Sequence, residues 1–144
     1  MQVQIDNRQS KQRISKKKIR QIATAILNAL GYPDAELSIL IVDDQQIARL
    51  NRQYLNRKGP TNVIAFSMQD GPFSEIAPNL LGDVVISVET AHRQALNAGL
   101  GMRAYFNQLL IHGILHLLGY DHENDKSEAR KMERKAKELL KLIS

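Results

Sequence analysis

The stretch RAYFNQLLIHGILHLLGYDH, residues 103–122, decides how the rest of the chain must be arranged. Apolar side chains such as Leu109, Ile111 and Leu115 would lie on nearly every side of a helix here, and no Lys, Arg, Asp or Glu occurs between Arg103 and the end of the apolar run. A helix that is apolar all round belongs inside a fold. The sequence therefore predicts a central buried helix over residues 103–118, followed by a glycine stop.

The remaining elements are predicted from periodicity and from capping residues. Alternating or β-branched runs predict four strands, at residues 3–7, 36–43, 61–66 and 80–87. Helical spacing predicts four further helices, at about residues 19–30, 44–54, 90–98 and 125–140. In the second of these, Ile47, Leu50 and Tyr54 should face inward. Four short strands with interspersed and then consecutive helices indicate an α+β or α/β domain.

Composition limits the class of protein. A chain of 144 residues fits one domain, residues 1–144, with a core of its own. It has no cysteine, and no apolar run reaches the roughly 20 residues of a membrane span. With a polar N-terminus, this predicts a cytoplasmic protein without membrane contact. The net charge of +5 is compatible with a nucleic-acid partner and also with solvated lysine faces.

Three of the four histidines fall within eleven residues, at spacings of four and six. His112 and His116 project from one face of a helix, one turn apart. Gly119 can take the left-handed conformation, so the chain can turn and His122 can close onto the same point. Three imidazoles and an open fourth position are typical of catalytic zinc sites, although nickel, copper or iron would also accept these ligands. We predict one Zn²⁺ per chain and treat the separate His92 as a surface or hydrogen-bonded residue.

The spacing H-x-x-x-H-x-x-G-x-x-H is the zinc signature of the metzincin proteases, which carry a glutamate after the first histidine. This chain has Gly113 there, so protease chemistry lacks its base. Gly113 has two interpretations: it leaves space beside the metal for a phosphate and its riboses, or it permits close packing against the sheet. Asp121 is expected to orient an imidazole or to cap the turn.

Basic residues form two clusters. The C-terminal cluster alternates with acids at pairing distance and indicates a solvated helix face. The N-terminal run, residues 11–20, contains no acid. Its Lys16, Lys17 and Lys18 are candidate RNA contacts, with a solvated face as the alternative.

The chain resembles the YbeY family of bacterial metal-dependent endoribonucleases in three segments. HGILHLLGYDH matches every fixed position of the family's histidine motif, while PTNVIAFS (60–67) and LLGDVVIS (80–87) resemble two further family blocks. The resemblance implies an α+β fold, with a small four-stranded mixed sheet, about five helices and the metal-bearing helix at the centre. It assigns the metal to His112, His116 and His122. It further implies cleavage of single-stranded RNA in 16S rRNA maturation and ribosome quality control, with ribosomal RNA and the ribosome as partners and no DNA substrate.

One position departs from the family. An arginine usually follows the tyrosine before the P-T-N block, whereas Leu55 stands here. Arg57 is the nearest arginine beyond it, and Arg52 and Lys58 are alternative phosphate contacts. Arg57 and Asp121 are thus the candidate catalytic residues. The competing hypothesis is a ribosome-associated RNA-binding factor whose metal is mainly structural.

Overall fold

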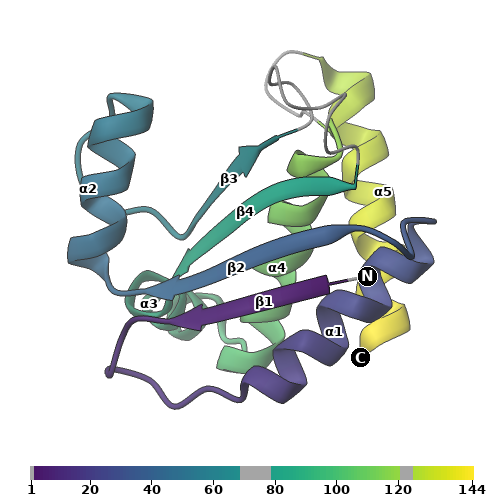
Figure 1. Cartoon of the computed structure of the whole chain (residues 1–144). Coiled ribbons are helices and arrows are strands. Elements are labelled where there is room, and N and C mark those ends of the chain that lie inside the picture. Colours follow the sequence, from purple (N-terminus) through teal and green to yellow (C-terminus); the bar gives the residue numbers. More distant parts are fainter. Residues whose placement is uncertain (1, 69–78, 121–124) are drawn as a thin grey trace.

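The computed structural model describes residues 2–68, 79–120 and 125–144. Four strands form one mixed sheet in the order β1-β2-β4-β3, in which β1, β2 and β4 are parallel and β3 is antiparallel to β4 (Figure 1). The strands are β1 (Gln2–Asn7), β2 (Glu36–Val42), β3 (Val63–Ser67) and β4 (Leu80–Ser87). The helices are α1 (Lys16–Ala29), α2 (Asp44–Leu55), α3 (Val88–Ala98), α4 (Met102–Leu117) and α5 (Lys126–Ile143). This confirms the predicted α+β fold.

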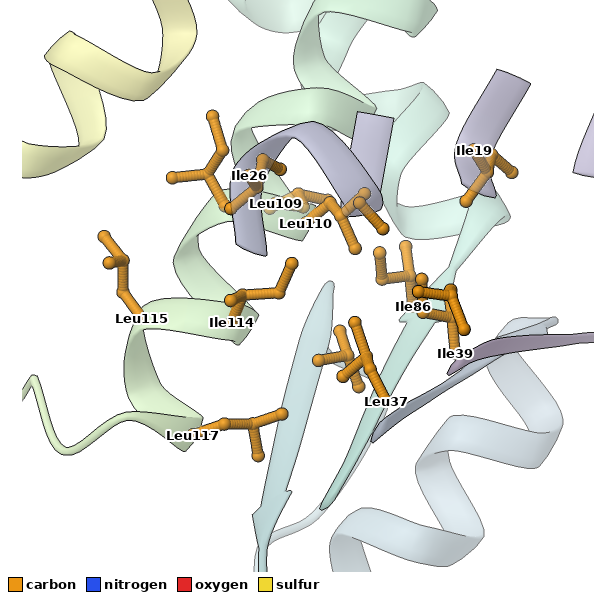
Figure 2. Close-up of a cluster of buried hydrophobic side chains, with 14 of the residues drawn as sticks. Ile19, Ile26, Leu37, Ile39, Ile86, Leu109, Leu110, Ile114, Leu115 and Leu117 are labelled. Atoms are coloured by element: carbon orange, nitrogen blue, oxygen red, sulfur yellow. The ribbon is translucent and has the colours of Figure 1, made fainter. Parts of the chain in front are cut away.

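Helix α4 is the central element of the fold. It lies between the sheet and α5, and it also contacts α3 and α1 (Figure 1). Leu110, Ile114 and Leu115 are fully buried, so the apolar sides of the helix have partners in several directions. They belong to one core cluster with Ile26 from α1 and Leu37, Ile39 and Ile86 from the sheet, and Figure 2 shows Ile114 on the side of α4 that faces the sheet and Leu115 on the far side. The prediction of a buried helix is confirmed, including its bounds to within one residue.

The two faces of the sheet are covered unequally. Along β4, Val84 and Ile86 point into the large core shared with α1 and α4. Between them, Val85 points to the opposite face, where it joins a small cluster with Ile47 of α2 and Ile64 of β3. Alternation along the strand thus places α4 on one face and α2 on the other.

The prediction that Tyr54 faces inward is wrong. Ile47 is fully buried and Leu50 is half-buried, but Tyr54 is 60% exposed and only meets the edge of Phe66, with ring centroids 5.5 Å apart. The cluster beneath α2 is small, so only the first turns of the helix find a buried partner. In the last turns Asn51 is buried instead, and its Nδ2 donates to the carbonyl of Gly59 at 3.0 Å.

Asp44, in the first turn of α2, joins that helix to α3. Its Oδ1 accepts from the hydroxyls of Ser87 (2.7 Å) and Thr90 (2.6 Å), and its Oδ2 accepts from Arg93 Nη1 at 2.8 Å. Burial raises the pKa of this carboxyl, but the three donors act more strongly together and hold the pKa below its ordinary value. The network therefore favours the ionised carboxylate.

Candidate metal centre

His112 and His116 lie one turn apart on α4 and point toward each other. Their Nε2 atoms are 2.9 Å apart, and their rings cross at 73° with centroids separated by 4.5 Å. Both side chains are half-buried, whereas Gly113, Ile114 and Leu115 between them are buried. The apolar residues thus hold the helix in the core, and the two imidazoles emerge on a side that remains partly open.

The convergence of two Nε2 atoms fits a shared metal ion. Two imidazoles bound to one tetrahedral zinc at about 2.0–2.1 Å place their nitrogens roughly 3.3 Å apart, close to the observed separation. In the described part of the chain, these are two of the three predicted ligands. The third, His122, lies outside the described residues, as does Asp121, the predicted partner of an imidazole.

The end of α4 has the geometry predicted for Gly119. This residue has φ +95°, its N–H donates to the carbonyl of His116 at 3.0 Å, and the N–H of Tyr120 donates to the carbonyl of Leu115 at 3.0 Å. These two bonds form a Schellman motif, which ends a helix and turns the chain away from its axis. The reversal begins one turn after His116, as the spacing of the motif requires.

Gly113 is explained by packing against the sheet. A Cβ atom placed on it would lie 2.7 Å from Cγ1 and 3.2 Å from Cγ2 of Val84, and 3.3 Å from Cγ2 of Val63. The position therefore faces β4 and β3. The interpretation that Gly113 opens space for a phosphate is wrong, because that direction is already filled by valine side chains.

A cavity of about 430 Å³ opens beside His112, between α4, α5 and the start of β3. Beside His112, its polar lining comes from side chains that no sequence pattern marked as functional: Asn62, Tyr105, Gln108, Glu133 and Lys137. Gln94 of α3 fixes one wall, because its Oε1 accepts from Asn62 Nδ2 (2.9 Å) and from the Tyr105 hydroxyl (2.8 Å). Asn62 belongs to the PTNVIAFS block, so the motif marked the segment, although nothing in the pattern gave the residue a role.

The predicted basic residues do not line this cavity. Arg52, Arg57 and Lys58 are exposed at the end of α2 and in the loop that follows it. That loop is held by Asn51, whose carbonyl accepts from the Arg57 N–H at 3.2 Å. Arg57 thus has a defined backbone position, but its side chain is not among those that surround His112.

The candidate RNA contacts of the N-terminal run lie elsewhere. Lys16, Lys17 and Lys18 are exposed in the first turn of α1, which packs near the start of α4 rather than near the histidines. His92 is half-buried in α3 and lines none of the principal cavities in the described part of the chain. No helix among the described residues has the length and hydropathy needed to cross a membrane.

Comparison with known proteins is consistent with the sequence and the geometry. The family model described as Endoribonuclease YbeY matches residues 4–144. Endoribonuclease YbeY of Geobacter sulfurreducens is 48% identical over 144 residues, covering 99% of this chain and 96% of that protein. The Syntrophotalea carbinolica protein of that name is 50% identical over 142 residues, covering 98% and 95%. The solution structure of TM1509 from Thermotoga maritima matches with a TM-score of 0.68 at 21% identity, covering 98% of this chain and 88% of that one, which shows the shared fold. The chain belongs to the endoribonuclease YbeY family.

Proposed function

We propose that this protein is a zinc-dependent endoribonuclease that cleaves single-stranded RNA in 16S rRNA maturation and ribosome quality control. The observation that carries the proposal is the convergence of His112 and His116 at 2.9 Å, within the histidine motif of an endoribonuclease family. The relatives named above carry the same activity in their names. The ribosomal part of the proposal is supported by the family resemblance alone.

The chemistry of the site suits a phosphodiester better than a peptide. Bound zinc would lower the pKa of a water molecule and stabilise negative charge on phosphoryl oxygens. His112 and His116 would hold the metal, with His122 proposed as the third ligand. Beside them, Asn62 and Gln108 offer neutral hydrogen-bonding groups to a substrate in the cavity. Since position 113 has no carboxylate, a peptide substrate would lack the acid and base that its amine leaving group requires.

Metal analysis tests the ligand assignment. We expect one zinc per chain in the wild type and a loss of zinc in His116→Ala, since a site with two imidazoles is incomplete. His92→Ala is the matched control, because it removes the one histidine outside the motif and should retain the metal. Full zinc occupancy in His116→Ala would contradict the site.

Cleavage tests the activity itself. The purified protein should cut single-stranded RNA, leave duplex RNA intact and lose activity after chelation, with recovery when zinc is restored. Precursor 16S rRNA within ribosomal particles is the substrate for the finer proposal. RNA binding without any cleavage by the zinc-loaded protein would instead favour the RNA-binding factor with a structural metal.

A further inference from the structure

A second cavity, of about 470 Å³, lies at the other end of α4, between the first turns of α4 and α1. Its walls are apolar and its rim is basic. The apolar lining consists of Ile14, Ile19, Ile22, Met102 and Phe106. The rim carries Arg13, Lys18 and Arg103, and no acidic side chain lines the cavity in the described part of the chain. This size is within the range of small-molecule sites.

Two helix N-termini add to the positive charge of this rim. Helix α1 begins after Ser15, and helix α4 begins after Gly101, which provides no side-chain cap. Neither helix has an acidic residue in its first turn, where one would normally offset the helix dipole. The hydroxyl of Ser15 already accepts from the Lys18 N–H at 3.2 Å, so α4 is the helix whose first N–H groups have no side-chain cap. Uncapped N–H groups at a helix start favour anions, and here they adjoin three cationic side chains.

Asn107 provides an independent indication that the cavity takes a ligand. Its side chain lines the cavity and is only 9% exposed, yet no described residue is hydrogen-bonded to its amide. A primary amide has two donors and an acceptor, and no fully buried side-chain nitrogen or oxygen among the described residues lacks a partner, so the amide atoms of Asn107 are accessible from the cavity. The amide is therefore placed to bond something that enters from the cavity.

We infer that this cavity is a binding site for a nucleotide, with the base between the apolar walls and the phosphate at the basic rim. A nucleobase combines apolar faces with a polar edge, which matches the Phe106 and Met102 walls together with the Asn107 amide. Asparagine can form a bidentate pair with the edge of adenine, so adenine is the base expected to bind best. An acidic peptide would use the rim but would leave the amide and the apolar walls without a matching group.

The nucleotide belongs, in our inference, to an RNA strand, and this part rests on the proposed function. Asn107 and His116 are nine residues apart, which is about two and a half turns of α4, so they lie on opposite sides of the helix. A nucleotide in this cavity is then remote from the bond that is cut. The cavity would hold the strand and leave the histidine site to act on another nucleotide.

Titration of the full-length isotope-labelled protein with AMP tests the site by NMR. We expect the side-chain NH₂ signals of Asn107 to shift and saturate with AMP, and to shift far less with inorganic phosphate or with adenosine. Asn107→Leu should weaken AMP binding by about tenfold or more. Lys18→Glu should weaken it as well, whereas Lys126→Glu is the matched control, since Lys126 is an exposed lysine in the first turn of α5 that does not line the cavity and its loss should have a much smaller effect.

Further ligands identify the source of the nucleotide. A single-stranded oligoadenylate that binds more tightly than AMP, with a loss in Asn107→Leu, supports an RNA strand, while equal affinities would overturn that part and leave a free nucleotide. Three results would overturn the site. The first is that inorganic phosphate alone shifts the signals as much as AMP does, and the second is that Asn107→Leu leaves the AMP affinity unchanged. The third is that an oligoglutamate peptide binds more tightly than AMP and displaces it. The cleavage assay is separate: wild-type protein that binds AMP at Asn107 without cutting RNA contradicts the proposed function, whereas normal cutting with no AMP binding contradicts only this inference.

Discussion

Replacing Gly113 with alanine should destabilise the protein, although alanine is the better helix former. The added Cβ would overlap Cγ1 of Val84 at 2.7 Å, and rotating Val84 brings its other methyl group, now at 3.2 Å, into the same space. Val84 is fully buried and paired on both sides, opposite Ile39 and Ala65, so its strand resists displacement. Overpacking costs roughly 1–3 kcal/mol, and the gain in helix propensity offsets about 1 kcal/mol. The rigidity of the site favours the upper part of that range, giving a net loss of about 1–2 kcal/mol.

Urea unfolding of four proteins measures this effect: the wild type, Gly113→Ala, Val84→Ala and the double variant. Val84→Ala alone should lose about 2 kcal/mol or more, because it removes buried methyl groups. In that background the new methyl group has room, so Gly113→Ala should become neutral or stabilising by up to about 1 kcal/mol. The sign of the substitution therefore reverses between the two backgrounds, with a coupling of roughly 2 kcal/mol.

Stabilisation by Gly113→Ala in the wild-type background would refute the packing explanation. Additive effects in the double variant would refute it as well, because they would show that Gly113 and Val84 do not compete for the same space.

Three other outcomes are expected. Gly82→Ala should cost more than about 3 kcal/mol in urea unfolding or prevent folding, because residue 82 has φ +137° and a Cβ there would overlap the carbonyl oxygen of Phe66. Asp44→Asn should lower the free energy of unfolding, and the difference from the wild type should have its full size above the ordinary carboxyl pKa of 3.8. It should shrink as the pH falls through the lower pKa that Asp44 has in the folded protein, as measured by unfolding at several pH values. Cleavage should continue at a site whose sugar is 2′-deoxy and should leave a 5′-phosphate, because we assign the three motif histidines to the metal and His92 lies apart in α3. Resistance at that site, together with a 2′,3′-cyclic phosphate on unmodified RNA, would instead require another residue to deprotonate the 2′-hydroxyl.

Much of the fold could be predicted because local signals and tertiary packing agree. The strand over residues 80–87 and the helix that follows it were predicted closely, since Ser87 caps that helix and Gly99 ends it in the left-handed conformation. Helix α4 was recognised for a related reason: few environments other than a core accept a helix with so little polar surface. The prediction that His112 and His116 lie side by side required only the helical repeat.

The features that were missed depend on contacts between segments distant in sequence. Periodicity placed Tyr54 inward, but it gave no measure of how far the sheet extends beneath α2. Asn62 is held in the cavity wall by its hydrogen bond to Gln94 of α3, a residue 32 positions away in the sequence. The position of Asn107 in the wall of the second cavity is visible only once α1 lies against α4, because a lone asparagine in an apolar helix has no distinctive spacing.

The glycine that replaces the protease glutamate follows from how α4 serves the core and the site together. The helix is buried on several sides, so the direction in which a side chain points decides which neighbouring element it packs against. One residue beyond His112, the helix has turned by about 100°, and the side chain at position 113 must point at the sheet. A glutamate there would meet Val84 and Val63 rather than a metal-bound substrate, and it would bury a carboxylate without a partner in the described surroundings. The close approach of α4 to β4 is thus sufficient to exclude the base from this position. A proton acceptor, where the reaction needs one, has to come from the open side of the histidines, and the cavity that His112 lines is where it should be sought.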